Sequence, residues 1–327
     1  MARKRMLRAN AAASGAVSVL DAFDEYIYQK EAENKSEKTI RNYIQSFGIL
    51  STYYHWDRTT EFDEVNEKTF YQWIQAMKKN DTRASSINHY LRDCRTFFNW
   101  AIDKEYMLPL DSKFKWKIEE QEELPKLYTD FELELLLEKP NRGKNASATD
   151  WRIWTIVNLI LSCGLRADTV INLRTNDVDF AKEEIYIRKT KAKKAYIVPL
   201  SPSCALALRE YIKMWRSGEH ATEWLFPDIT ESKMSYNALR LSYERYCKNR
   251  GVENTSIHSL RHNFAKGFIR NGGNPLMLQK ILGHSTLTMT KHYVNLFSED
   301  LKEGYADFSP LDVMKKKYKR TKKLERS

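Results

Sequence analysis

The chain has 327 residues, of which 42% are hydrophobic and 30% charged, a balance typical of a globular protein long enough for two domains with separate cores. No apolar run approaches the roughly 18 residues that a membrane span needs, and the first residues lack the sustained apolar segment of a secretory signal. The sequence therefore excludes a membrane-spanning or disordered chain and predicts a protein that works in the cytoplasm.

The net charge of +11 is concentrated at the two ends of the chain. Residues 1–8 contribute four positive charges and residues 315–327 a net +7, so residues 9–314 are formally neutral. Any contact between this neutral body and nucleic acid must come from basic side chains gathered on one face. The ends could be ordinary solvated segments or could add non-specific attraction to phosphates.

The cysteines predict neither a disulfide framework nor a zinc ribbon. They are scattered and form no C-x-x-C pair, which favours reduced and mostly buried thiols. The four positions are Cys94, Cys163, Cys204 and Cys247.

A helical domain is predicted over residues 16–107, after a basic N-terminal tail at residues 1–15. Its apolar residues return every three or four positions, the period of amphipathic helices. We expect four helices: one near residue 19, one capped by Ser36, one after Asn66 and one from about Ser85. The positions expected in the core are Leu20, Phe23, Ile27, Ile40, Tyr43, Ile44, Phe47, Phe70, Trp73, Ile74, Met77, Ile87, Leu91, Cys94, Phe98 and Ile102.

Four polar side chains of the fourth helix lie off this apolar stripe and are candidates for DNA contact. They are Arg83, Asn88, Arg92 and Arg95. An ordinary solvated face explains them as well as a DNA-binding face does, and the sequence favours neither.

A linker is predicted at residues 108–125, because this segment is bracketed by prolines, rich in charge and free of helical periodicity. The second domain, residues 126–310, opens with a helix capped by Thr129 and continues into a strongly apolar helix around 154–163. Residues 184–188 and 195–200 alternate like strands and predict a β-hairpin joined by the basic link KTKAKK. Helical patterns then return, so the predicted fold class is mainly α with a small β-hairpin or sheet (α+β).

Four short pieces of the second domain, in fixed order, carry groups suited to metal-free phosphoryl transfer. They are Cys-Gly-Leu-Arg ending at Arg166, the hairpin lysines, His-Ser-Leu-Arg from His258 to Arg261, and Gly-His ending at His284 with Tyr293 nine positions later. Two guanidinium groups can grip the oxygens of an attacked phosphodiester. On a helix, a histidine three residues before an arginine projects to the same face.

The nucleophile is expected to be the Tyr293 hydroxyl, whose ordinary pKa near 10 calls for a base or a positive environment. His258 is the candidate base. Lys191 is the candidate acid that protonates the leaving deoxyribose oxygen.

Each piece has an ordinary structural explanation when taken alone. Arg166 could be a surface side chain, His258 and His262 could be a core pair or a metal pair, and Tyr293 could be a half-buried aromatic residue. The metal interpretation lacks a third ligand, because no H-E-x-x-H motif, cysteine pair or acidic cluster stands nearby. Only the order and spacing of the pieces together favour a catalytic site.

Taken together, the GLR, VPL, HSLRH and LGHS motifs and the tyrosine nine positions after the last histidine resemble the tyrosine recombinases, a family that includes phage and conjugative-element integrases and Xer resolvases. The catalytic resemblance covers about residues 129–296. The helical domain before it resembles the core-binding domain of the family, and the two domains would close on DNA as a C-shaped clamp.

The resemblance implies a role for each matching residue. Arg166 and Arg261 would bind the scissile phosphate, His258 would transfer a proton, His284 would hydrogen-bond the phosphate and Tyr293 would be the nucleophile. The hairpin lysine of the family stands seven positions before the valine of VPL, which gives Lys191 here. Lys189 and Lys193 are rivals because a shift of two residues keeps the same face of a strand, and both are also candidates for DNA contact.

One position departs from the family pattern. The family commonly has a carboxylate three residues after the first arginine, whereas this chain has Thr169 there and Asp168 just before it. Either residue is expected to give weaker support to the site.

The resemblance also implies the reaction and the partners. Cleavage would form a 3′-phosphotyrosyl link without ATP, metal or other cofactor, and two exchanges through a Holliday junction would recombine two double-stranded DNA sites held by four protomers. Residues 311–327 would hold a docking segment, anchored by Leu311, Val313 and Met314, and a basic tail. Accessory DNA-bending or directionality proteins are possible further partners.

The preferred biological role is integration or excision of a mobile element, and the protein is then expected on DNA in the nucleoid. The alternatives are an Xer-like dimer resolvase, a type IB topoisomerase that relaxes supercoils without exchanging partners, and a non-catalytic DNA-binding regulator on the same fold. An intact set of six site residues argues against the regulator.

Overall fold

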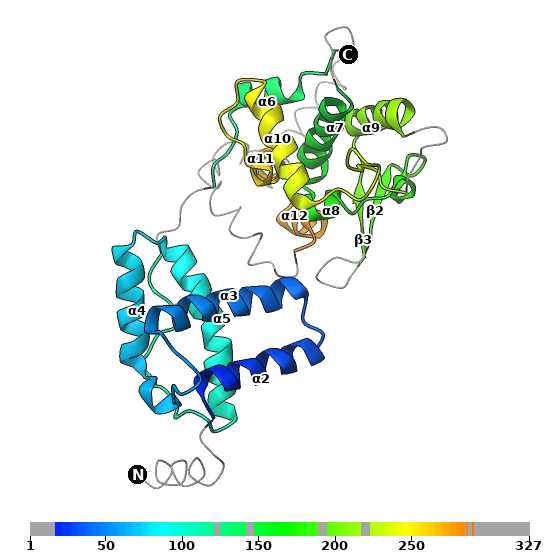
Figure 1. The fold of residues 1–327 in the computed structure, drawn as a ribbon. Helices are drawn as coiled ribbons and strands as arrows, with labels where there is room; N and C mark the ends of the chain where they lie inside the picture. The colour runs from blue at the N-terminus through cyan, green and yellow to red at the C-terminus, as the bar shows by residue number, and fades with distance from the viewer. Residues whose placement is uncertain are drawn as a thin grey trace, which may run out of the picture. The chain divides into compact units, whose positions relative to one another are not determined.

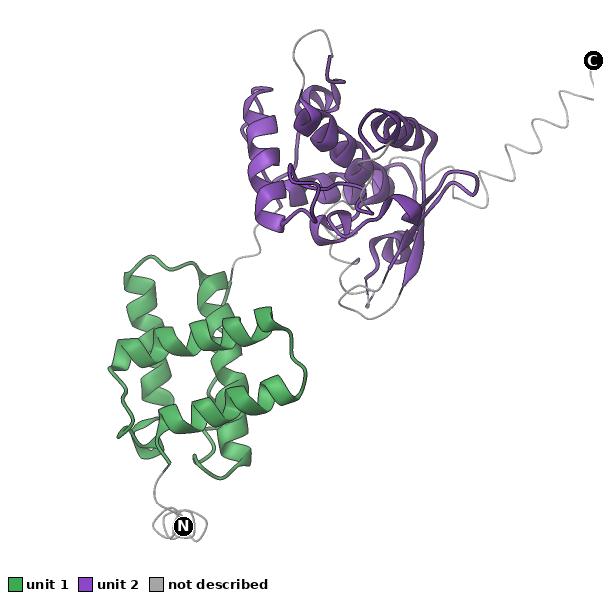
Figure 2. Cartoon of the chain, turned by 45° about the vertical axis from the view of Figure 1, so that its right-hand side comes forward, with its two compact units in different colours: residues 1–123 green, residues 124–327 purple. Residues whose placement is uncertain are grey.

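The fold is described from a computed structural model of the chain. The residues that it describes are 17–120, 125–141, 147–188, 195–216, 223–284, 286 and 290. The chain divides into two compact units, residues 1–123 and residues 124–327, which Figure 2 shows in different colours. Each unit has its own hydrophobic core, so each is described by itself.

The described part of unit 1 is helical (Figure 1), as the sequence predicts. Its elements are α2 (Val19–Ala32), α3 (Glu37–Tyr54), the 3₁₀ turn η1 (Phe62–Glu64), α4 (Glu67–Lys79) and α5 (Ala84–Asp103). The predicted caps are confirmed, since the side chain of Ser36 accepts a hydrogen bond from the Thr39 amide and that of Asn66 accepts one from the Lys68 amide. These contacts satisfy amide groups that the first turn of a helix leaves without partners.

The core of unit 1 is rich in aromatic rings. Phe23 of α2 stacks on Phe47 of α3 at a centroid distance of 3.8 Å, and Phe97 of α5 meets Phe23 edge-on at 5.1 Å. Most of the predicted core positions are buried or packed against this cluster. Ile44 is the exception at 48% exposed, so its predicted burial is wrong. Its neighbours Tyr43 and Phe47 already fill the inward face of α3, and Ile44 lies a quarter turn away from them.

Most of the predicted linker, residues 108–123, falls within unit 1. Phe114 is buried in the core of this unit, and Trp116 and Ile118 pack against it. Asn88 of α5 holds the segment, because its side-chain oxygen accepts a hydrogen bond from the Ile118 amide (2.9 Å) and its amide group donates to the Ile118 carbonyl (3.2 Å). These three apolar side chains anchor residues 114–118 as an extended strap. They do not follow helical spacing, so helical periodicity does not predict the strap.

Unit 2 combines helices with a small sheet, so the predicted fold class, mainly α with little β, is confirmed. The helices are α6 (Asp130–Leu137), α7 (Ala148–Cys163), α8 (Ala167–Val170), α9 (Pro202–Trp215), α10 (Tyr236–Lys248), α11 (Ile257–Arg270) and α12 (Pro275–Leu282). Helix α7 is buried along nearly its whole length and packs against α6, α9, α10 and α11 (Figure 1). The predicted cap of α6 is confirmed by a capping box of Thr129 and Glu132.

The sheet has three antiparallel strands in the order β1-β2-β3. Their bounds are β1 (Val178–Asp179), β2 (Glu184–Ile187) and β3 (Tyr196–Pro199), after the 3₁₀ turn η3 (Thr175–Asp177). The predicted hairpin is β2 paired with β3, in a register that places Ile185 opposite Val198 and Ile187 opposite Tyr196. The basic link 189–194 lies outside the described residues.

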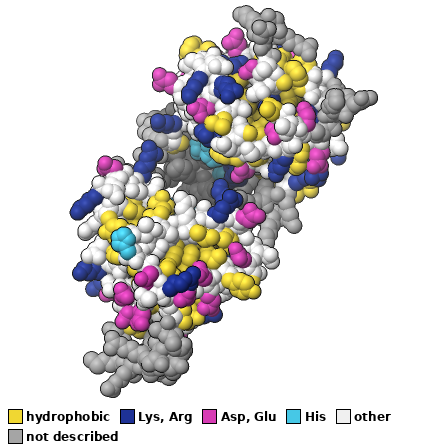
Figure 3. Space-filling view, in the orientation of Figure 1, with side chains coloured by type: hydrophobic (Ala, Val, Ile, Leu, Met, Phe, Trp, Pro, Cys, Tyr) yellow, Lys and Arg dark blue, Asp and Glu magenta, His cyan; other side chains and the backbone are white. Residues whose placement is uncertain are grey.

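The distribution of surface charge and the state of the cysteines agree with the sequence analysis. On the face in Figure 3, basic and acidic side chains are interspersed over the described residues of each unit. The four cysteines are free and buried, as predicted. No helix within the described ranges is long and apolar enough to cross a membrane.

Candidate active site

The site in unit 2 begins at a glycine turn that ends α7. Gly164 caps the helix with φ of +61°, in the left-handed region that glycine tolerates best. A Cβ atom at this position would lie 2.3 Å from Cδ1 of Phe264 and 2.7 Å from Cδ2 of Leu282. Conformation and space therefore both require glycine, and the turn leads the chain into Arg166 at the start of α8.

Arg261 is the buried centre of the site. It lies on α11 with only 3% of its surface exposed. Its Nη1 donates to the Gly164 carbonyl (2.7 Å), and its Nη2 donates to the Leu282 carbonyl (3.1 Å) and contacts Nε2 of His284 at 2.8 Å. The guanidinium group thus ties the end of α7 to the end of α12.

Arg166 converges on the same carbonyl oxygen. Its Nη1 donates to the Leu282 carbonyl at 3.3 Å, so the guanidinium groups of Arg166 and Arg261 meet at one acceptor. Two residues separated by 95 positions therefore place positive charge side by side. Such a pair suits a dianionic transition state at phosphorus.

His284 follows the glycine turn that ends α12. Gly283 has φ of +61°, and the imidazole that follows is 9% exposed. Because arginine can only donate, Nε2 of His284 accepts from Arg261; the proton of the neutral ring then lies on Nδ1, which donates to Thr290 Oγ1 at 2.9 Å. Burial lowers the pKa of His284 to about 4, with further lowering by the charges of Arg261 and Arg166, so the ring is neutral near pH 7.

His258 lies one turn before Arg261 on α11, and its side chain reaches the surface. Removal from water by the surrounding protein lowers the pKa of His258 below 6.5, and the charges of Arg261 and Arg166 act in the same direction. The carboxylate of Asp168, the residue just before the position where the chain departs from the family pattern, opposes this shift.

A cleft of about 690 Å³ opens beside His258. Lys126 and Arg240 line it together with three glutamates, Glu132, Glu244 and Glu253. His258 is exposed to solvent in this cleft, and the lining mixes positive and negative side chains.

The other predicted members of the site are the hairpin lysines and the tyrosine nucleophile. Lys189, Lys191 and Lys193 fall in the link between β2 and β3, and Tyr293 follows residue 290, so all four lie outside the described residues. The structure therefore brings together Arg166, Arg261 and His284, with His258 one helical turn away. Within the described ranges, no group of three or more His, Cys, Asp or Glu side chains could hold a metal ion.

Four further groups contribute to this site and were not predicted from the sequence. They are the Leu282 and Gly164 carbonyl groups, the Thr290 hydroxyl and the ring of Tyr196. The strand alternation of β3 could have placed Tyr196 on the inward face with Val198. Backbone acceptors carry no sequence signal.

The candidate DNA-contacting residues of unit 1 lie on α5, with Arg83 at its N-cap, and differ in their surroundings. Arg83 and Arg95 are exposed, whereas the amide of Asn88 is occupied by the strap described above. Asn88 therefore has a structural role, and a DNA contact by its side chain would require these hydrogen bonds to break.

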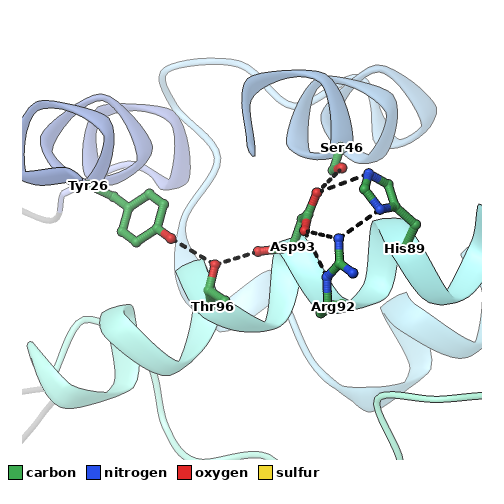
Figure 4. Close-up of polar contacts among 6 residues, drawn as sticks. All are labelled: Tyr26, Ser46, His89, Arg92, Asp93 and Thr96. Carbon is green, nitrogen blue, oxygen red and sulfur yellow. Dashed lines mark hydrogen bonds and ion pairs between the residues drawn. The ribbon is translucent and has the colours of Figure 1, made fainter. Parts of the chain in front are cut away.

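Arg92 belongs to a polar cluster built on the buried carboxylate of Asp93 (Figure 4). Its Nε and Nη2 donate to one oxygen of Asp93 at 3.3 and 3.2 Å, and its Nη2 also lies 2.7 Å from Nδ1 of His89. The second oxygen of Asp93 accepts from Ser46 of α3 (3.0 Å) and lies 3.3 Å from Nε2 of His89. The cluster holds Arg92 against α5 while leaving its side chain 65% exposed.

Comparison with known families accounts for both units. The model of the phage integrase family matches residues 126–300, more than half of the chain, and the model of the phage integrase N-terminal SAM-like domain matches residues 20–105. The chain therefore belongs to the phage integrase family, the tyrosine recombinases, which are enzymes of site-specific recombination.

Relatives match over most of their own length. Tyrosine recombinase XerA of Thermococcus kodakarensis is 28% identical over 292 residues, 88% of this chain and 93% of the relative. Tyrosine recombinase XerD of Staphylococcus saprophyticus is 23% identical over 279 residues, 84% of this chain and 93% of the relative.

Solved structures share the fold at low sequence identity. The Tn1549 transposon integrase in complex with a circular intermediate DNA aligns with a TM-score of 0.67 at 19% identity, over 85% of this chain and 95% of that chain. A lambda integrase tetramer bound to a Holliday junction aligns with a TM-score of 0.67 at 14% identity, over 86% of this chain and 78% of that chain.

Proposed function

We propose that this recombinase cleaves and rejoins double-stranded DNA through Tyr293, with the phosphodiester bound where Arg166, Arg261 and His284 meet. The observation that carries the proposal is the convergence of these side chains on the turn at Leu282. A site that gathers two guanidinium groups beside a neutral imidazole is suited to an anion with several oxygen atoms.

In the cleavage step, the Tyr293 oxygen attacks phosphorus and the bond to the 5′ oxygen breaks. The phenol proton passes to His258, and Lys191 protonates the leaving 5′ oxygen. The lowered pKa of His258 keeps its ring unprotonated near neutral pH, as a base requires. The products are a 3′-phosphotyrosyl link and a free 5′-hydroxyl, so the bond energy is retained and ATP is not consumed.

His284 has to change its hydrogen bond when DNA arrives. Its Nε2 accepts from Arg261 in the DNA-free protein, so donation from Nε2 to a phosphate oxygen requires a proton on that nitrogen. Thr290 can support this change, because a hydroxyl can donate to Nδ1 as readily as it accepts from it.

Strand exchange would join two DNA sites within an assembly of four protomers, with residues 16–107 as a core-binding domain and residues 126–310 as the catalytic domain. A role in moving a mobile element is supported by the fold shared with the Tn1549 transposon integrase and the lambda integrase. The proposed docking residues of the 311–327 segment lie outside the described residues.

An Xer-like resolvase is the second candidate. The observation in its favour is that XerA and XerD relatives align over 84–88% of this chain and 93% of their own length. The two roles share the same chemistry and differ in which DNA sites are joined.

The test begins with binding selection of a DNA site from a random-sequence pool. A panel of duplexes with this site, each nicked at a successive position, then serves as suicide substrates, because a short 5′ fragment diffuses away and traps the covalent intermediate. Wild-type protein in EDTA is expected to form a covalent adduct with at least one duplex, and Tyr293→Phe none. Specific binding without any adduct would instead support the non-catalytic regulator.

A plasmid with two copies of the selected site separates recombination from relaxation. Deletion or inversion between the copies is expected from a recombinase. Supercoil relaxation without exchange would support the topoisomerase alternative.

A further inference from the structure

Tyr196 of β3 reaches the phosphate site from the sheet. It pairs with the buried Ile187 across the hairpin, so it lies on the inward face of the two strands. Its ring covers Gly283, where a Cβ atom would lie 2.9 Å from Cζ and 3.0 Å from the hydroxyl oxygen. The hydroxyl therefore stands beside Gly283. The residue before it, Leu282, supplies the carbonyl oxygen that both arginines contact, and the residue after it is His284.

The surroundings of this hydroxyl are positively charged. Burial raises the pKa of Tyr196, and the nearby charges of Arg261 and Arg166 oppose that shift. The phenol therefore keeps its proton near neutral pH and can donate a hydrogen bond. Among the described residues, no hydrogen-bond partner of the Tyr196 hydroxyl is found.

Building on the function proposed above, we propose that Tyr196 is a further phosphate-binding residue, whose hydroxyl donates a hydrogen bond to a non-bridging oxygen of the phosphodiester held by Arg166 and Arg261. The oxygens of a phosphodiester have more lone pairs than the donors of two arginines can satisfy. The half-buried Tyr196 hydroxyl, beside both guanidinium groups, can supply a further donor.

The matched control comes from the same hairpin. Tyr186 lies on β2 opposite Ile197 and is 49% exposed, on the face away from Tyr196. Tyr186→Phe removes a hydroxyl of the same kind without touching the arginines. Tyr196→Phe keeps the ring that covers Gly283, so the turn before His284 is retained.

The experiment measures single-turnover cleavage of the suicide duplex at saturating protein. Loss of a hydrogen bond to a charged group predicts that Tyr196→Phe is roughly ten- to a hundredfold slower than wild type, with DNA affinity and thermal unfolding little changed. Tyr186→Phe is expected to cleave at the wild-type rate.

A direct contact also predicts which oxygen is involved. Replacing either non-bridging oxygen of the scissile phosphate by a methyl group gives two methylphosphonate stereoisomers. The difference between wild type and Tyr196→Phe should vanish on the stereoisomer that lacks the oxygen bound by Tyr196 and persist on the other. The assignment would be overturned if the Tyr196→Phe variant cleaved the phosphodiester as fast as wild type. It would also be overturned if the variant were slower than wild type by the same factor on the phosphodiester and on both methylphosphonate stereoisomers.

The outcomes separate this inference from the function on which it rests. Adduct formation by wild type together with equal rates for Tyr196→Phe would remove the Tyr196 contact and leave the recombinase chemistry intact. Failure of wild-type protein to form any adduct would overturn both.

Discussion

Arg261 of unit 2 and Arg92 of unit 1 lie on long helices and contact histidines, but the fold holds them in opposite ways. Arg261 is 3% exposed and its guanidinium group bonds two carbonyl oxygens and an imidazole. The Arg92 side chain is 65% exposed and shares a carboxylate with His89. The described acceptors of Arg261 are neutral groups of a buried turn, whereas Arg92 pairs with the carboxylate of Asp93 and keeps most of its side chain in solvent.

This difference separates two tasks in one chain. A reacting phosphate needs a charge that does not move, because displacement by about 1 Å can slow a reaction a hundredfold. A contact with the DNA backbone tolerates movement and is weakened by salt. In the proposed function, the fixed Arg261 suits the first task and the exposed Arg92 suits the second.

The largest effect is expected from Arg261→Ala. Loss of preorganised donors predicts a fall in single-turnover cleavage by about two to three orders of magnitude, with DNA affinity largely kept. Arg92→Ala should give the reverse pattern, with weaker DNA binding, most strongly at low salt, and an unchanged rate at saturation. Equal losses of binding and cleavage in Arg261→Ala would refute its role at the phosphate.

The glycine turn under Arg261 can be tested with two alanines. Gly164→Ala forces a Cβ atom into Phe264 and Leu282 at φ of +61°, and we expect a loss of about 2–4 kcal/mol in the free energy of unfolding. Gly267 of α11 has open space around it, so Gly267→Ala should stabilise the chain by about 0.5–1 kcal/mol. Thermal and urea unfolding measure both, and a neutral Gly164→Ala would show that the turn can relax.

On the unit 1 side of the comparison, Asp93→Asn tests the cluster under Arg92. The amide cannot accept from Arg92, His89 and Ser46 as the carboxylate does, so the free energy of unfolding of unit 1 should fall by about 1–3 kcal/mol. Asp24→Asn, which breaks the exposed ion pair with Arg58, is the control and should change little. Cleavage at saturating protein should be unaffected by either change.

The smallest effect concerns pH. A base must be unprotonated, so cleavage should fall on the acidic side as pH drops through the pKa of His258, which lies below 6.5. Asp168 raises this pKa, so Asp168→Asn should move the acidic limb of the rate profile to lower pH by roughly a few tenths of a unit. A shift to higher pH, measured over pH 5 to 8, would show that another group controls the limb.

Much of the fold could be predicted from the sequence because its signals are local. Ser36, Asn66 and Thr129 cap helices through their own side chains, and the alternation of β2 and β3 reports a sheet with one buried face. The strap at Phe114 and the exposure of Ile44 depend on tertiary packing, so periodicity alone could not give them.

The candidate site divides in the same way. Arg166, His258, Arg261 and His284 stand out by motif, but the carbonyl group of Leu282 that joins the two arginines has no signature in the sequence. Tyr196 was one of 18 tyrosines until the structure placed its ring against Gly283.

The most direct test of the central claim is to map the DNA-linked residue of the covalent adduct by mass spectrometry. After nuclease and trypsin digestion, a 3′-linked nucleotide is expected on the peptide 292–302, at Tyr293. A nucleotide on the peptide 195–209, which holds Tyr196, or on any other residue would contradict the assignment of Tyr293 as the nucleophile.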